Sequence, residues 1–127
     1  AQLTEHVDIM PTILDYAGIR VPYGVQGMSM GPILRGDSGA GRAFALTEFN
    51  CYDWGLNIKT ITSRDYKLTY YAGERFGELY DRNADPDEFV NRWDDPDYAD
   101  VKAELLKQLT DRIIETEDTL PIRIGKY

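Results

Sequence analysis

A long segment rich in glycine and proline constrains the fold more than any other feature of this sequence. Residues 18–42 carry a glycine or a proline at short intervals, and both residue types interrupt helices and strands. We therefore expect this segment to be mostly loop, with one helical turn at residues 29–34. Irregular stretches of this length are uncommon inside a compact domain. The sequence thus predicts a boundary after residue 42, with residues 1–42 ending a larger domain and residues 43–127 forming a smaller one.

The part before this segment is predicted to form one short helix at residues 9–17. Its apolar side chains recur at helical spacing, namely Met10, Ile13, Leu14 and Ala17. Asp8 is expected to cap the start, Pro11 lies in the first turn, and Gly18 ends the helix. A helix this short is marginal in water without a surface to pack against. We expect its apolar side to pack on another domain, or on a second copy of the chain where that domain is missing.

The part after residue 42 changes to a pattern of β-branched and aromatic residues, which strands favour. Strands are predicted at residues 43–49, 58–63, 66–71 and 78–81, with short connections between them. Such connections imply an antiparallel sheet of roughly four strands.

A long helix at residues 96–117 follows these strands. Asp95 is expected to cap it, and Pro96 occupies its first position. An apolar stripe runs along the helix through Tyr98, Val101, Leu105, Leu109 and Ile113. This stripe is expected to cover one face of the sheet, so the fold class is α+β.

The charge of the chain excludes two classes of partner. Acidic residues outnumber basic ones, 22 to 14, which gives a formal net charge of −8. Such a chain repels the phosphate backbone of nucleic acid and the anionic surface of membranes, so neither partner is expected. The sequence has no apolar run close to the ~20 residues of a membrane-spanning helix.

The sequence contains no complete catalytic or metal-binding set. Cys51, the only cysteine, lacks a neighbouring base or cation, and His6, the only histidine, is not accompanied by a nucleophile motif. Residues 81–92 begin like an EF-hand loop, but Pro86 stands where that loop needs glycine and Arg92 where it needs glutamate. We therefore expect no catalytic residue, metal ligand or cofactor in this chain itself, and a plain turn at residues 81–92.

The best candidates for ligand contact lie in two loops. Asn50, Tyr52 and Trp54 fall in an aromatic loop at residues 49–55, and Arg75 lies at the tip of a later hairpin. Tyrosine and tryptophan offer a flat stacking face and a polar end, as sugar and aryl groups require. Packing against another domain explains the same residues equally well, so both roles stay open.

Four motifs, in order along nearly the whole chain, resemble those of the sulfatase family. Residues 7–18 are similar to the pattern D-x-x-P-T-L/I-L-x-x-A-G, and residues 25–36 to G-x-S-L-x-P-L-L-x-G. Residues 61–68 are similar to R-T-x-x-Y-K-L, with Ile-Thr in place of Arg-Thr, and residues 78–91 to E-L-Y-D-x-x-x-D-P-x-E-x-x-N.

The resemblance implies an alkaline-phosphatase-like enzyme in which a large α/β domain precedes a small subdomain of antiparallel sheet and helix. Such enzymes hydrolyse sulfate esters with a formylglycine, made from Cys or Ser in C/S-x-P-x-R, and a calcium ion that stabilises the sulfate oxygens. The formylglycine cannot be placed in this chain, because Tyr-Asp-Trp-Gly follows Cys51. The resemblance places the calcium ligands before the helix at residues 9–17. By this resemblance, residues 1–42 end the large domain, and residues 43–127 give structural support and help to select the substrate, without activity alone.

The partners implied are a preceding catalytic domain and a sulfated small molecule or carbohydrate. Ala1 rather than methionine stands first, and we expect a piece of a longer protein. Two alternatives stay open. One is an accessory module that binds carbohydrate or protein without catalysis, and the other is the C-terminal part of a related phosphodiesterase or phosphonate hydrolase.

Overall fold

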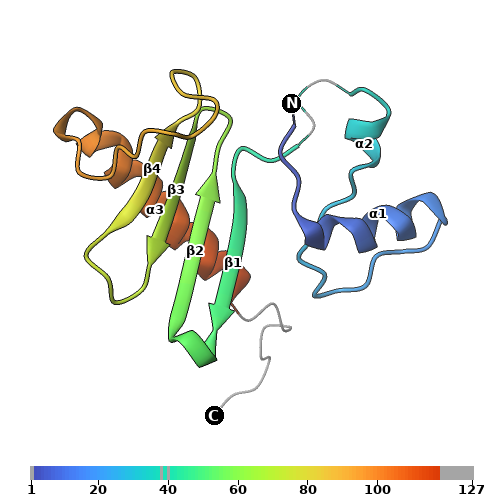
Figure 1. Cartoon of the computed structure of the whole chain (residues 1–127). Coiled ribbons are helices and arrows are strands. Elements are labelled where there is room, and N and C mark those ends of the chain that lie inside the picture. Colours follow the sequence, from blue (N-terminus) through green and yellow to red (C-terminus); the bar gives the residue numbers. More distant parts are fainter. Residues whose placement is uncertain (1, 38, 40, 118–127) are drawn as a thin grey trace, which may run out of the picture.

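The computed structural model describes residues 2–37, 39 and 41–117, and it shows the α+β fold expected from the sequence. Figure 1 shows a sheet with a long helix on one side of the molecule and two short helices on the other. In chain order the elements are α1 (Ile9–Tyr16), α2 (Gly31–Leu34), β1 (Ala45–Cys51), β2 (Leu56–Thr62), β3 (Tyr66–Tyr71), β4 (Gly77–Asp81) and α3 (Ala99–Thr116). None of the helices within these described ranges is both long and apolar enough to cross a bilayer.

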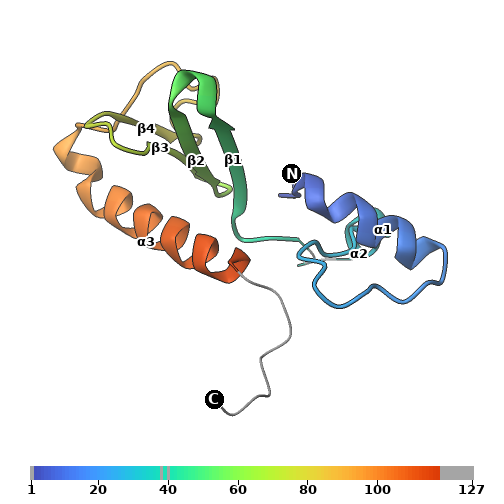
Figure 2. The same cartoon turned by 90° about the horizontal axis from the view of Figure 1, so that it is seen from below.

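The four strands form an antiparallel meander in the order β1-β2-β3-β4. Ile61 of β2 lies opposite Leu68 of β3, which in turn lies opposite Leu79 of β4, so the three side chains form one row. Helix α3 covers this row with Leu105 and Leu109, and Figure 2 shows it crossing that face of the sheet. The predicted sheet and its helical cover are therefore confirmed.

The start of α3 follows from its capping residues. The Asp95 carboxylate accepts a hydrogen bond from the Asp97 N–H at 3.0 Å, and Pro96 opens a 3₁₀ turn that leads into the helix. One turn into α3, the Lys102 ammonium lies over the Trp93 ring, 4.7 Å from its centroid. The same ring packs against Gly77, where a Cβ atom would lie only 2.5 Å from the indole. The chain between β4 and α3 is thus fixed at Trp93.

The outer edge of β4 is closed by residues that follow it in the chain. The Asn91 side chain accepts hydrogen bonds from the Leu79 and Trp93 N–H groups and donates one to the Gly77 carbonyl. The Arg92 N–H donates to the Leu79 carbonyl at 2.7 Å. An edge strand otherwise exposes unpaired backbone groups. Asn91, the last residue of the fourth sequence motif, therefore has a structural role in pairing them.

The hairpin between β1 and β2 is longer than predicted. Strand β1 continues to Cys51 and β2 begins at Leu56, because Asn50 and Cys51 pair with Asn57 and Leu56 across the hairpin. Gly55 adopts a positive φ of 64°, which lets the chain reverse within a short turn. Asn50 therefore lies in a strand, and the predicted aromatic loop shrinks to the turn Tyr52–Trp54 and Gly55.

Candidate functional site

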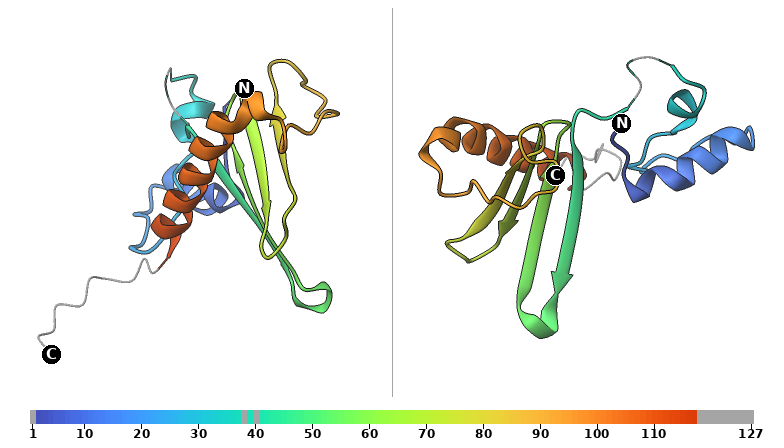
Figure 3. Two further views of the ribbon diagram at one scale, coloured as in Figure 1. Left: turned by 90° about the vertical axis from the view of Figure 1, so that its left-hand side faces the viewer. Right: turned by 45° about the horizontal axis from the view of Figure 1, so that its top comes forward.

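Two hairpin turns carry the predicted ligand contacts, and both lie at the same end of the sheet. In an antiparallel meander, alternate connections meet at one end, so the β1–β2 turn and the β3–β4 connection are neighbours. Figure 3 shows that the β1–β2 hairpin extends beyond the other two strands. The last pair between β2 and β3 is Ile58 with Tyr71, which leaves the end of the longer hairpin without a neighbouring strand.

The longer hairpin carries both an exposed indole and a hydrogen-bonded side-chain amide. Trp54 is 74% exposed in the turn. The Asn50 Oδ1 accepts a hydrogen bond from the Lys59 ammonium at 3.2 Å, and that ammonium also pairs with Glu48 at 2.6 Å. Tyr52 begins the turn, and its part in binding stays a prediction.

Lys59 is a residue of this hairpin that the sequence motifs did not single out. The feature that identifies Lys59 is the strand register, which places it directly opposite Glu48 of β1. Opposite charges at such positions attract, and here they fix the ammonium beside Asn50.

Arg75 lies exposed in the neighbouring connection between β3 and β4. The base of this connection is aromatic, since the Phe76 ring packs on the Tyr71 ring with centroids 4.7 Å apart. The Tyr71 hydroxyl donates to Glu78 at 2.8 Å, and this bond, with burial, raises the pKa of Tyr71. An exposed guanidinium and an exposed indole thus stand on adjacent hairpins, offering an anion-binding group and a stacking face.

The described residues do not fit the chemistry of a formylglycine or a calcium site. Cys51 ends β1 opposite Leu56, and His6 lies exposed in the 3₁₀ turn before α1. Across residues 2–37, 39 and 41–117, no three His, Cys, Asp or Glu side chains gather as a metal site. One carboxylate oxygen of Asp81 accepts hydrogen bonds from the backbone N–H groups of Asn83 and Ala84, so it stabilises a turn.

Helix α1 stands beside the sheet (Figure 2), and its apolar side chains are exposed. Ile13 is 63% exposed, and several neighbours are similarly open, namely Val7, Ile9, Met10 and Tyr16. A groove of about 650 Å³ runs between this side of the helix and the backbone at residues 24–27. This surface is unusual for the outside of a stable domain. Association of two copies through it stays a prediction.

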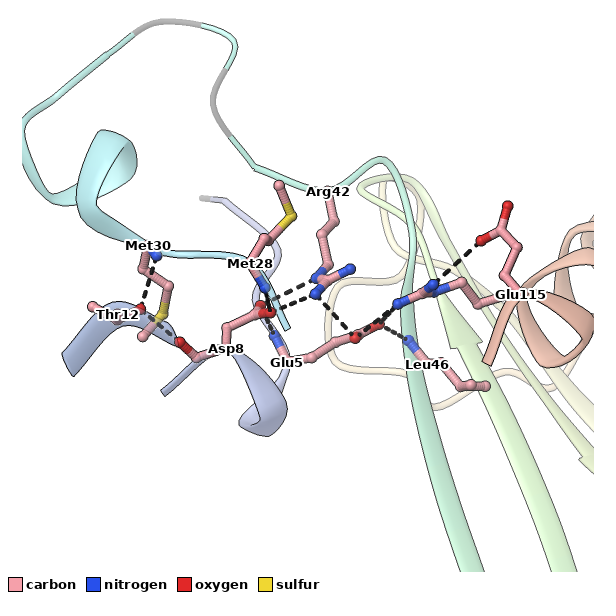
Figure 4. A network of polar contacts seen from close by, with 9 residues as sticks. Glu5, Asp8, Thr12, Met28, Met30, Arg42, Leu46 and Glu115 are labelled. Carbon is pink, nitrogen blue, oxygen red and sulfur yellow. Dashed lines mark hydrogen bonds and ion pairs between the residues drawn. The ribbon is translucent and has the colours of Figure 1, made fainter. Parts of the chain in front are cut away.

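Asp8 organises the N-terminal part of the chain (Figure 4). It is 1% exposed, and its two carboxylate oxygens accept from the N–H groups of Glu5 and Met28, both at 2.8 Å. They also accept from Nε and Nη2 of Arg42. Asp8 is the N-cap residue of α1, as expected, but its side chain makes no capping bond to that helix. It accepts the Glu5 N–H in a capping box of the preceding 3₁₀ turn and binds the more distant Met28 and Arg42.

Asp8 also explains why residues 26–30 do not behave as a loose linker. Besides the Met28 bond, the Met30 N–H donates to the Thr12 hydroxyl, which itself donates to the Asp8 carbonyl. Gly27 packs so closely that a Cβ atom would lie 2.0 Å from the Val7 carbonyl oxygen. The glycine of the second sequence motif is therefore required by contact with the first.

Glu5 extends the same network to the sheet and to α3. Its carboxylate, 7% exposed, accepts from the Leu46 N–H at 2.8 Å and pairs with Arg42 at 3.4 Å and Arg112 at 3.1 Å. Figure 4 shows Glu5 between Arg42 and Leu46, on the side of the network that faces the sheet. One carboxylate thus joins the N-terminal segment, β1 and α3.

The charges in this network reinforce one another. Burial alone raises the pKa of the Asp8 carboxyl, but hydrogen bonds from Arg42, Glu5 and Met28 outweigh it, so the pKa lies below its usual value. The hydrogen bond to Asp8 raises the pKa of Arg42. Both groups are therefore charged at neutral pH.

Proteins with similar sequences include several sulfatases. Residues 1–115 match the family described as "N-sulphoglucosamine sulphohydrolase, C-terminal". The chain is 33% identical over 115 residues to a Delta 4,5-hexuronate-2-O-sulfatase and 30% identical over 126 residues to an N-acetylglucosamine-6-O-sulfatase, both of Bacteroides thetaiotaomicron. These matches cover 88% and 94% of this chain but 24% and 23% of the relatives, so the chain spans about a quarter of their length.

Similar solved structures include sulfatases and a phosphonate hydrolase. A 2-O GAG sulfatase gives a TM-score of 0.79 at 33% identity, covering 87% of this chain and 25% of the other. A structure in complex with its substrate, D-glucosamine-2-N,6-O-disulfate, gives 0.77 at 29% identity, covering 93% and 25%. A phosphonate monoester hydrolase from Silicibacter pomeroyi gives 0.79 at 25% identity, covering 92% and 26%.

Proposed function

This chain belongs to the sulfatases, in the family of N-sulphoglucosamine sulphohydrolase C-terminal domains, and from that premise we propose that the intact protein hydrolyses sulfate esters of carbohydrates. The relatives named above act on a hexuronate and on N-acetylglucosamine, and one related structure holds a sulfated glucosamine. These names support a sulfated sugar as the substrate class. In the intact enzyme, this chain supplies structural support and part of the substrate selection.

The uncovered apolar side of α1 is the structural observation that supports packing of this chain on a catalytic domain. The chain matches about a quarter of its relatives' length, and α1 exposes apolar side chains that a neighbouring domain would bury. We assign residues 1–42 to the edge of the catalytic domain and residues 43–127 to the C-terminal subdomain. In this assignment, the catalytic domain is the main partner of the subdomain formed by the sheet and α3.

The nucleophile and the metal belong to that catalytic domain in this proposal. A formylglycine would attack the sulfur atom, and a calcium ion would stabilise charge on the sulfate oxygens. The residues of this chain contribute binding and orientation only. The chain alone should therefore release no sulfate from an aryl sulfate, whereas the intact protein should do so.

The two hairpin turns are the proposed substrate contacts. Trp54 and Tyr52 offer aromatic faces for a sugar ring, Asn50 offers an amide, and Arg75 offers a cation for an acidic substituent. The exposure of Trp54 and Arg75 supports this role, since both side chains are open to a ligand. Packing of Trp54 on the catalytic domain is the competing explanation.

Single alanine substitutions at Tyr52, Trp54 and Arg75 in the intact enzyme separate these explanations. A binding role predicts a loss of kcat/KM of about tenfold on a sulfated disaccharide, with turnover of a small aryl sulfate retained. Phe89→Ala, which removes another exposed aromatic side chain from the turn after β4, is the matched control. Equal losses on both substrates, with a lower Tm, would leave only a packing role.

A phosphonate hydrolase is the second candidate, because the fold match to a phosphonate monoester hydrolase is as close as the matches to sulfatases. The same subdomain would then serve a different catalytic centre. The intact protein assayed with an aryl sulfate and with a phenyl phosphonate monoester distinguishes the two. A higher kcat/KM on the phosphonate would replace the sulfatase proposal.

A further inference from the structure

The junction between the N-terminal part and the sheet is polar. The buried apolar cluster of the described residues lies in the sheet, in α3 and at Trp93. Two cavities of about 370 and 310 Å³ flank the junction, one beside Thr4 and Glu48 and the other beside Met28 and Asp111. Apolar packing across this junction is therefore thin, and charged contacts must hold the two parts in place.

Those contacts form one continuous chain of ion pairs from α1 to α3. Asp8 binds Arg42, Arg42 pairs with Glu5, and Glu5 pairs with Arg112 of α3. All four side chains are largely shielded from water, with Glu5 also bound to the Leu46 amide in β1. Buried charge pairs demand good geometry, which makes them effective at fixing a single arrangement.

A change of orientation at this junction causes a larger displacement at the far end of β1. At about 3.3 Å per residue, the seven residues of β1 carry the β1–β2 turn roughly 23 Å away from it. A rotation of about 5° at the junction then moves the turn by about 2 Å, and a misplacement of about 1 Å can cost about 100-fold in rate.

We propose that Glu5 and Arg42 are positioning residues for substrate selection, because their ion pairs set the angle at which the sheet and its hairpin turns meet the body that carries α1. This inference rests on the proposed function, in which α1 belongs to the catalytic domain. Neither residue touches the substrate. They act by holding Trp54 and Arg75 at the position where a bound sugar meets them.

The test uses the intact enzyme with Arg42→Met, which keeps the aliphatic stem but removes the charge, and Arg42→Lys, which keeps the charge but loses the two-pronged contact. Lys107→Met removes an exposed ion pair with Asp111 on α3 and serves as the control. Arg42→Met should lower kcat/KM on a sulfated disaccharide about tenfold, mainly through KM, and change turnover of para-nitrophenyl sulfate less than about twofold. Arg42→Lys should fall in between, and the control should match the wild type.

Hydrogen exchange of the same variants supplies a readout that does not depend on activity. In Arg42→Met, the Leu46 amide should exchange at least about tenfold faster, while the Leu68 amide in the centre of the sheet should keep its protection. Equal losses on both substrates together with faster exchange at Leu68 would show a merely structural role and overturn the inference. Unchanged kinetics in Arg42→Met would also overturn it.

The two proposals fail in different ways. A wild-type enzyme that releases sulfate from neither substrate contradicts the proposed function. An active wild type whose Arg42→Met variant keeps its substrate preference contradicts the positioning role alone. Even if the wild type is inactive, an unchanged exchange rate of the Leu46 amide in Arg42→Met would show that the ion pairs do not couple the N-terminal part to the sheet.

Discussion

Asp8→Asn is expected to lower the local stability of the N-terminal part far more than a conservative substitution normally does. Each carboxylate oxygen of Asp8 accepts two N–H groups, Oδ1 from Met28 and Arg42 and Oδ2 from Glu5 and Arg42. An asparagine keeps one oxygen and replaces the other with an NH₂ group, which donates rather than accepts. Whichever way the amide is turned, two donors lose their acceptor.

The size of the effect follows from that count. A buried donor left without a partner costs about 1–3 kcal/mol, so two of them cost about 2–6 kcal/mol. Arg42 keeps Glu5 as a second partner at 3.4 Å, which offsets part of the loss of charge. We therefore expect the local opening free energy to fall by about 2–4 kcal/mol.

Hydrogen exchange measured by NMR reads this opening directly. The Met30 amide, which donates to Thr12 at 2.8 Å, should lose protection by about 30- to 700-fold in Asp8→Asn. Asp15→Asn is the control on the same helix, because the Asp15 carboxylate accepts the Ser29 hydroxyl at an exposed position, and an amide oxygen can replace that acceptor. If both variants protect Met30 equally, the buried carboxylate does not organise this segment and the reasoning is wrong.

Two further predictions concern the core and the response to acid. Gly77→Ala should destabilise the protein by about 1–3 kcal/mol in urea denaturation, since its Cβ would lie 2.5 Å from the Trp93 ring that Lys102 covers. Because the pKa of Asp8 lies below 3.8, its contribution to stability is present above pH 3.8 and is lost as the pH falls through the folded-state pKa. Protection of the Met30 amide should therefore drop below pH 3.8 in the wild type and vary little with acid in Asp8→Asn.

Local sequence patterns predicted the sheet and α3 because both depend on near neighbours. The alternating residues of β2 and β3 and the stripe that contains Leu105 and Leu109 lie within single elements, so their spacing alone indicates the buried side. The end of β1 was missed because Asn50 and Cys51 are polar or small, and only pairing with β2 extends the strand.

The junction network could not be predicted in the same way. Asp8 is 20 residues from Met28 and 34 from Arg42, and nothing in local spacing distinguishes such a partner from the nearby amides of a helix start. The local rule therefore made Asp8 a cap. Only the three-dimensional approach of Arg42, the last residue of the Gly- and Pro-rich segment, shows that the Asp8 carboxylate binds partners outside the helix.

The residues that carry the family resemblance and those proposed to contact substrate are separate sets. Asp8, Gly27 and Asn91 belong to the motifs, and each has a structural role. Asp8 holds the junction, Gly27 lets residues 26–30 pack against Val7, and Asn91 pairs with the edge of β4. Trp54 and Arg75 lie outside all four motifs, on turns that the sheet holds at one end. A sulfatase scaffold built this way can change its substrate by changing the turns, because the contacts that orient the sheet do not involve them.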